Sequence, residues 1–449
     1  MSAWRSLLSR SHPLLSRLPP VRCHARQLAP LVGNSNLIYS RGYASNPNSS
    51  GDSQAQQRAA PERHLYVVLD DHKDSYSIYK LDMDDDKDIM DGGNATSLQR
   101  LLVDEPPHLD VLLEMLGKWA RFAAVGTRIF CIGYYTPGGR VIIYDTKKSS
   151  LEFHLLEDVR DGYKAAMAAG QRLYILEHWS KIPPFYQQYR RDEGEDTHLG
   201  SLHCLTNHPK NGGVNQLLLW QWQPLMSGFS QWRCSDNRYL LMLPFDARRI
   251  HVHAVHTPPG SVHHQIYVSA LVPGERKVIT FTFGTESESK IWTRHGAWQL
   301  PVVGHAHYDD VLDAWLGLHA GQDGGMHKPS VMDGHLCAGN VTSAPSEWKI
   351  SREKLFHLNE DTAAGWRHLN AKLVPMEPGD GGNEYCLMEH LRPEKEWWMG
   401  RGDKCLLRLT RFRVRRGEDG EPVAMARRPA RSYRVSRYNE DFDVQAVWM

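Results

Sequence analysis

The sequence lacks several features that would each assign a protein to a definite class. No apolar run approaches the ~20 residues that a helix needs to cross a bilayer, so no membrane span is predicted. The seven Cys are scattered singly without a C-x-x-C pair, which is typical of neither a zinc site nor a disulfide scaffold. This spacing fits buried free thiols in a reducing compartment. The seven are Cys23, Cys131, Cys204, Cys234, Cys337, Cys386 and Cys405.

Three common catalytic motifs are also missing. The chain has no G-x-x-x-x-G-K-[ST], no G-x-S-x-G and no H-E-x-x-H, so phosphate-loop, α/β-hydrolase and zincin chemistries lack their minimum residues. S-x-x-K occurs without its companion motifs and reads as chance, at Ser77, Ser287, Ser346 and Ser351. We therefore predict no catalytic residue and no cofactor.

Acidic side chains are missing from the first 50 residues, which hold six of the 53 Lys and Arg and none of the 52 Asp and Glu. An Arg-rich, Ser-rich segment without acids is typical of an organellar transit peptide. On a helical projection, apolar side chains share one side and Arg side chains lie away from it, which suits the import machinery. The apolar set is Trp4, Leu7, Leu8 and Leu15, and the basic set is Arg5, Arg10 and Arg17.

The pattern RGYAS at 41–45 resembles the mitochondrial processing signal, in which Arg stands three residues before the cut. It predicts cleavage between Tyr43 and Ala44, with Arg41 as the recognised residue, and a mitochondrial transit peptide over 1–43. A chloroplast address and a basic tail that lacks acids by chance are the alternatives. The polar, Pro-containing segment that follows predicts a disordered linker over 44–62.

The body, 63–449, reads as mostly β. Its 14 Trp and many Gly and Pro favour strands joined by frequent turns. Alternating apolar and polar positions predict two strands from His64 and a hairpin in GTRIFCIGYYTPGGRVIIYDTKKSSLEFHLLED at 126–158. Between them, PHLDVLLEMLGKW has Leu at helical spacing and predicts a short helix.

The hairpin belongs to a unit that recurs. AVGTRIFCI at 124–132 returns as AAGQRLYIL at 168–176, and similar strand pairs follow around HHQIYVSAL, DAWLGLHA and NEYCLMEHL. A period of roughly 45 to 50 residues with four short strands is typical of a β-propeller. We predict an all-β, kelch-like propeller of six or seven four-stranded blades. A β-sandwich or two stacked β domains is the alternative.

A ring of blades predicts the positions of particular residues. Trp222, Trp292 and Trp298 should fill the space between neighbouring blades. Ring closure should pair the first strand, near 64–69, with the last copy, near 431–438. Closure would remove the exposed sheet edges that otherwise favour aggregation.

Several of these segments carry a resemblance. QIYVSAL, SKIWTRHGAWQLPVVGHAHYDDVLDAWLGLHA and HLCAGNV resemble a plant family of unknown function, expanded in grasses, as does the opening LYVVLDDHKDSYSIYKLDMDD. The resemblance covers most of 63–449. It implies a kelch-like propeller and provides no catalytic residues to transfer, because the family has no established activity.

Paired His are the candidate metal ligands. HVHAVH places His251 and His253 on one strand face, and His305 and His307 repeat the spacing. Two imidazoles two residues apart on a strand could share a divalent metal. The alternative is that these His simply line a polar sheet face.

An Arg cluster near the C-terminus is the candidate binding surface. Strand alternation puts Arg411, Arg413 and Arg415 on one face, with Arg416 beside them. This face could contact an acidic protein surface or RNA phosphates, or it could simply be solvated. We predict a non-enzymatic mitochondrial binding or scaffold module whose propeller loops contact a protein partner. An organellar RNA-associated protein and an enzyme with a site in the central channel are the alternatives.

Overall fold

The computed structural model describes part of the chain in detail, nearly all of it as β-strand. The described residues are 23–24, 64–72, 75–83, 101–103, 108–114, 120–133, 140–155, 163–178, 200–209, 218–225, 232–233, 239–240, 243–257, 263–272, 277–285, 292–321, 332–357, 365–376, 383–393, 403–438 and 445–449. They include no α-helix, only the 3₁₀ turns Ala247–Arg249 and Pro345–Glu347. None of the helices in these residues is long and apolar enough to cross a membrane.

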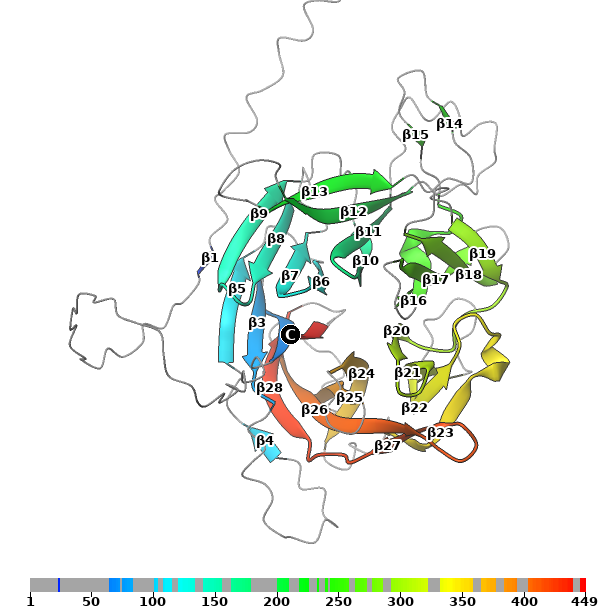
Figure 1. Cartoon of the computed structure of the whole chain (residues 1–449). Helices are drawn as coiled ribbons and strands as arrows, with labels where there is room; N and C mark the ends of the chain where they lie inside the picture. The colour runs from blue at the N-terminus through cyan, green and yellow to red at the C-terminus, as the bar shows by residue number, and fades with distance from the viewer. Residues whose placement is uncertain are drawn as a thin grey trace, which may run out of the picture.

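Antiparallel sheets follow one another along the chain and stand in a ring (Figure 1). The first holds β2 (Leu65–His72), β3 (Ser75–Leu81), β5 (His108–Glu114), β1 (Cys23–His24) and the C-terminal β29 (Gln445–Trp448). The second holds β6 (Arg121–Val125), β7 (Arg128–Ile132), β8 (Arg140–Asp145) and β9 (Ser150–Leu155). The third holds β10 (Tyr163–Ala169), β11 (Arg172–His178), β12 (Gly200–Pro209) and β13 (Leu218–Leu225). A separate small hairpin joins β14 (Trp232–Arg233) to β15 (Tyr239–Leu240).

Two further four-stranded units are joined into one sheet by the parallel pairing of β16 with β20. One unit holds β16 (Ile250–His256), β17 (Gln265–Val272), β18 (Lys277–Gly284) and β19 (Trp292–Gly296). The other holds β20 (Gly304–Asp309), β21 (Ala314–Ala320), β22 (Met332–Gly339) and β23 (Lys349–Lys354). The last sheet holds β24 (Trp366–Pro375), β25 (Glu384–Pro393), β26 (Asp403–Arg416), β28 (Arg431–Arg437) and β4 (Leu101–Val103), with β27 (Pro422–Met425) paired to β26.

The recurrence predicted from the sequence is confirmed at equivalent positions. Phe130, Tyr174, Tyr267 and Trp315 lie on β7, β11, β17 and β21, each the second strand of its unit. The first hairpins of two units turn at Gly126 and Gly170, both with φ of +58°. A glycine is favoured there because this left-handed backbone strains residues that carry a Cβ.

One strand from each unit lies at the centre of the ring. β6, β10, β16, β20, β24 and β29 contact one another in this order, and β29 contacts β6 again (Figure 1). The fold of the described residues is therefore all-β and propeller-like rather than a sandwich of two sheets.

The first and last strands of the body meet, but not where the sequence analysis expected. β2 pairs with β29 at 445–448, and His64 and Met449 exchange backbone hydrogen bonds of 2.8 and 3.1 Å. The predicted partner near 431–438 is wrong, because β28 is held inside the last sheet between β26 and β4. The chain end, and not the outer strand, supplies the innermost strand of the first sheet.

The predicted helix between the first two units is also wrong. Residues 108–114 form β5, whose Leu113 is buried and stands opposite Tyr76 of β3. A short apolar run fits either a helix or a strand by its own pattern. The free edge of β3 decides between them here, because pairing satisfies the backbone donors and acceptors of both strands.

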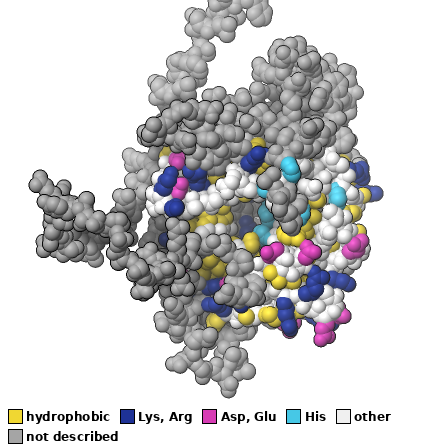
Figure 2. Space-filling view, viewed as in Figure 1, with side chains coloured by type: hydrophobic (Ala, Val, Ile, Leu, Met, Phe, Trp, Pro, Cys, Tyr) yellow, Lys and Arg dark blue, Asp and Glu magenta, His cyan; other side chains and the backbone are white. Residues whose placement is uncertain are grey.

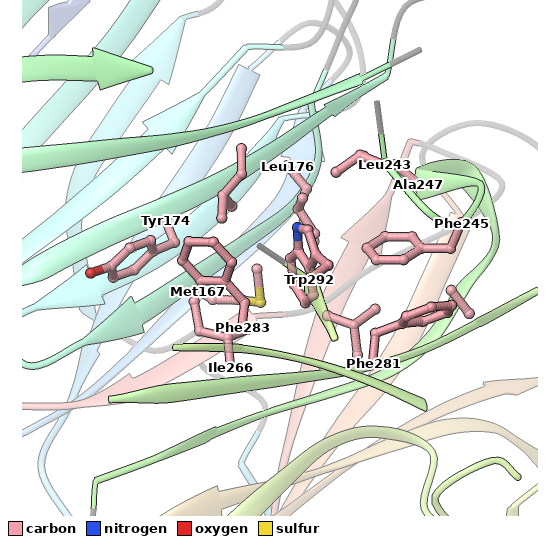
Figure 3. Close-up of a cluster of buried hydrophobic side chains, with 14 of the residues drawn as sticks. Met167, Tyr174, Leu176, Leu243, Phe245, Ala247, Ile266, Phe281, Phe283 and Trp292 are labelled. Atoms are coloured by element: carbon pink, nitrogen blue, oxygen red, sulfur yellow. The ribbon is translucent and has the colours of Figure 1, made fainter. Parts of the chain in front are cut away.

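Apolar side chains fill the space between neighbouring sheets. Trp292 of β19 is 1% exposed and packs with Phe245 and Phe283, with ring centroids 5.1 and 5.3 Å away (Figure 3). Met167, Tyr174 and Leu176 of the third sheet join the same cluster. The predicted position of Trp292 between blades is confirmed.

Trp298 is partly buried against the next cluster, between the units of β16 and β20, as expected. The side chain of Trp222 lies outside the described residues.

Five Cys, all free thiols, are buried in the described part of the chain, as the sequence analysis expected: Cys131, Cys204, Cys337, Cys386 and Cys405.

Candidate functional site: the central channel

The centre of the ring carries a group of His side chains. The parallel register between β16 and β20 sets His253 directly beside His305. Their ring centroids are 4.3 Å apart in an edge-to-face arrangement, and His305 stacks on His307 at 4.6 Å. Figure 2 shows His side chains at the wall of the hollow in the middle of this face.

Strand alternation explains why these imidazoles reach the channel. Val252 and Ala254 on β16 and Ala306 on β20 are buried between the two units. The intervening positions, His253 and His305, therefore point to the opposite side and remain half-buried. His307, two residues further along β20, shares that side.

The electrostatics of the cluster keep the imidazoles neutral. Burial lowers the pKa of His253 to about 4, with further lowering by His307 and by Lys372 of β24. Burial also lowers the pKa of His305 well below its usual value, and His253, His307 and Lys372 add to this effect. Burial lowers the pKa of His307 to about 4, although its hydrogen bond to the Leu373 carbonyl opposes the shift.

That hydrogen bond also orients one ring. His307 Nε2 lies 3.0 Å from the carbonyl oxygen of Leu373 on β24. Since a carbonyl only accepts, Nε2 carries the proton and Nδ1 of the neutral ring is an acceptor. The three inner strands β16, β20 and β24 thus share one polar site.

The predicted metal pair, His251 and His253, lies on β16, and both side chains are half-buried. His253 belongs to the channel cluster through its ring contact with His305. Burial and the nearby Arg249 lower the pKa of His251. In the part of the chain that the structure describes, no three His, Cys, Asp or Glu side chains are placed to hold a metal ion.

The Arg cluster of β26 does not form one outward face. Arg411, expected at the surface, is 6% exposed and donates to both carboxylate oxygens of Glu384, at 3.1 and 2.9 Å, and to the Met83 carbonyl. Arg413 is half-buried, while Arg415 and Arg416 are exposed. Arg416 donates to the Leu312 carbonyl. Long β26 runs from the sheet interior into an exposed hairpin, so its Arg side chains meet different surroundings.

A pocket of about 300 Å³ lies where this hairpin meets β22 and β23. Its lining has both signs of charge, with Arg352 and Arg415 opposite Glu353, Glu418 and Glu421. Arg352 Nε lies 3.1 Å from Glu421 Oε1, so part of the charge is already compensated.

The processing residues Arg41, Tyr43 and Ala44 lie outside the described residues.

Sequence reasoning did not predict that His253 and His305 lie side by side, or that Lys372 acts on the pKa of His253. The equal spacing of His251/His253 and His305/His307 was a visible signal, but the pairing of β16 with β20 was not. Lys372 sits in an ordinary alternating strand, and nothing local marks it.

Residues 62–433 match the family described as "Protein of unknown function (DUF1668)", so the chain belongs to this family. No curated protein matches the chain. Among solved structures, Trypanosoma rangeli sialidase in complex with 2,3-difluorosialic acid is similar at a TM-score of 0.37 and 11% identity, over 72% of this chain and 56% of that one. Pyrococcus horikoshii acylaminoacyl peptidase is similar at 0.32 and 10%, over 82% and 51%.

A structure described as the Dos1 propeller is similar at a TM-score of 0.25 and 7% identity, over 63% of this chain and 73% of that one. This chain thus spans little more than half the length of the sialidase and of the peptidase. At these scores the likeness carries no information about activity.

Proposed function

We propose that the chain is a non-enzymatic binding module of the mitochondrion, built as a kelch-like β-propeller of six four-stranded blades. The blade number is supported by the six inner strands that contact one another around the centre of the described residues. The resemblance of its motifs to a plant family expanded in grasses supports a plant origin. The acid-free, Arg-rich first 50 residues support the mitochondrial address.

The partner is a protein that contacts the β26–β27 hairpin and the neighbouring propeller loops. The observation that carries this proposal is that the Arg side chains of β26 differ in burial along the strand. Arg408 and Arg411 are buried in ion pairs with Glu389 and Glu384, so they serve the fold. Arg415 is exposed at the mixed-charge pocket, where it can pair with a partner carboxylate.

Proximity labelling from the full chain inside the organelle tests the partner. We expect a small set of mitochondrial proteins to be labelled, and the set to shrink with Arg415→Glu. Arg434→Glu is the matched control, because Arg434 is an exposed Arg on β28 of the same sheet and stands opposite Leu406, far along β26 from Arg415. Recovery of RNA in place of a protein partner, or equal labelling by both variants, would overturn this assignment.

Import of the full chain tests the address separately. We expect uptake by isolated mitochondria and a processed form that begins at Ala44. Arg41→Ala should slow or shift the cleavage. Uptake by chloroplasts alone would contradict the mitochondrial assignment without affecting the partner proposal.

A further inference from the structure

The outermost strand of the second sheet has a regular edge. The sheet order is β6-β7-β8-β9, so β9 lies at the rim of the ring and pairs only with β8 among the described residues (Figure 1). Its six residues stay in register with β8 without a bulge. The strand contains no Pro and no Lys, two residues that commonly keep an edge strand from pairing with another chain. β9 therefore has the backbone that a further strand can join.

The other outer strands carry features that hinder such pairing. β13 contains Pro224, which has no N–H to donate to a neighbouring strand. β19 and β23 each meet their neighbour with a bulge, and β23 also carries Lys349, Arg352 and Lys354. β5 is covered by β1, and β28 is covered by β4. Among the described outer strands, β9 is thus the one suited to an added strand.

Phe153 is the exposed aromatic side chain of β9. It stands opposite Ile142 of β8, on the face whose buried cluster includes Ile142 and Tyr144. Ile142 and Tyr144 are buried, whereas Phe153 is 55% exposed. Phe153 therefore extends an apolar face outward to the rim, where an added strand would remove it from water.

The residues on the two sides of Phe153 complement one another. If a second β9 pairs antiparallel with Phe153 opposite Phe153, then Glu152 stands opposite His154 of the other copy, and Leu151 stands opposite Leu155 of the other copy. Opposite residues share one face of the sheet, where aromatic pairs and opposite charges are stabilising. Within one chain, Glu152 Oε2 and His154 Nε2 already lie 3.6 Å apart. The pattern of β9 is therefore complementary to itself about Phe153.

We propose that β9 is a self-association surface, at which two copies of this chain pair edge to edge and join their second sheets into one continuous sheet. The occupant is a second copy, because it supplies the apolar and charged residues in the order that β9 requires, and a two-fold axis makes each contact twice. Only six residues from each copy pair, so the dimer is weak and forms at high protein concentration. The surface lies on the second sheet and does not depend on the partner of the β26–β27 hairpin.

Sedimentation velocity of the full chain over a series of concentrations tests the proposal. We expect a concentration-dependent dimer. Phe153→Asp should weaken the dimer by about tenfold or more, because two like charges would then stand opposite each other at the axis. Ile350→Asp is the control, because Ile350 is an apolar residue of the outer strand β23 that is 43% exposed. A chain that stays monomeric at every concentration, or equal dimerisation of Phe153→Asp and the unaltered chain, would overturn the proposal.

A charge exchange tests the register and leaves Phe153 in place. Glu152→Lys and His154→Glu should each associate more weakly than the unaltered chain. An equimolar mixture of the two variants should form a mixed dimer, since the introduced Lys of one copy meets the introduced Glu of the other. A mixture that associates no better than its components would contradict the pairing about Phe153.

Cross-linking covers the case in which a charged variant does not fold. The background carries Cys23→Ser and Cys234→Ser, because the side chains of these two Cys lie outside the described residues. With the shortest bifunctional thiol reagents, Phe153→Cys should give a covalent dimer and Ile350→Cys should not. The five described Cys are buried and should not react. Equal cross-linking of both variants, or capture by Phe153→Cys of other proteins in place of a second copy in an organelle extract, would overturn the proposal.

Discussion

Arg411 of β26 and Glu384 of β25 form a buried, two-point ion pair, with Nε 3.1 Å from Oε1 and Nη2 2.9 Å from Oε2. The same guanidinium donates to the carbonyl of Met83, at the end of the first hairpin of the body. One side chain thus ties the last sheet to the first.

Arg411→Met should destabilise the protein by about 3–5 kcal/mol, because it leaves the buried Glu384 carboxylate with only the more exposed Arg428, whose Nε is 3.9 Å from Oε1. Chemical denaturation gives the free energy of unfolding. Arg415→Met on the exposed end of the same strand is the control and should change it by about 0.5 kcal/mol or less. The double change Arg411→Met with Glu384→Leu should recover part of the loss. Equal stability of Arg411→Met and Arg415→Met would show that the pair does not hold the sheets together.

Trp292→Ala should cost about 3–5 kcal/mol, since it removes the largest side chain from the cluster between the third sheet and the unit of β16. Phe153→Ala is a matched loss of an aromatic ring at a site that is 55% exposed. It should change the free energy of unfolding much less. Thermal unfolding of both variants measures the difference, and a similar shift in Tm for the two would contradict the assigned packing.

Gly170→Ala should be more destabilising than Gly126→Ala, although both glycines have φ of +58°. The shared cost of placing a Cβ in left-handed backbone is about 1–2 kcal/mol. At Gly170 the new Cβ would also lie 2.6 Å from His264 Nε2, whereas at Gly126 its nearest neighbour is 3.6 Å away. Denaturation of the two single variants isolates the clash, and a second change, His264→Ala, should relieve it. Identical losses would mean that the His264 ring moves aside freely.

Stability should fall as the pH drops from about 6.5 to about 4. Burial lowers the pKa of His368 to about 4, and the nearby Arg408 contributes to the shift. Glu389 lies 3.9 Å from His368 Nε2, but it is ion-paired with Arg408 and does not reverse the effect. Unfolded His has a pKa of about 6.5, so the unfolded chain binds the proton first and gains population.

For His368 alone the full loss is roughly 3 kcal/mol, complete only below the folded pKa. His253 and His307, with pKa values of about 4, and His390, with a pKa of about 3, act in the same direction. Urea unfolding followed across this pH range measures the trend. His368→Leu should flatten it, and a His368→Leu profile parallel to that of the unaltered chain would contradict the assignment.

Local pattern was enough to predict many individual strands. The alternation around Phe130, Tyr174, Tyr267 and Trp315 predicted strands that recur, and the repeated Gly at 126 and 170 marked equivalent turns. These features depend on neighbours within a few residues, which is the range over which side-chain period and turn chemistry act. Leu113 shows the limit of such reasoning, because a Leu-rich run fits both periods until the edge of β3 is present.

The candidate sites were less accessible to sequence reasoning. Alternation correctly predicted that the side chains of Arg411 and Phe412 point in opposite directions. The sequence analysis expected the side of Arg411 to be exposed, but in the structure Arg411 is buried as Phe412 is. His253 and His305 lie 52 positions apart in the sequence and meet only through the parallel pairing of β16 with β20.

The sequence by itself determined that this chain forms short strands, that the strands recur as a unit, and that its first 50 residues carry positive charge alone. The tertiary structure alone decided which strand joins the chain ends, which Arg is buried and which His side chains share the channel. The physical reason is that hydrogen-bond pairing and desolvation between distant segments depend on register and on the faces in contact. Neither is encoded within the few residues that set local conformation.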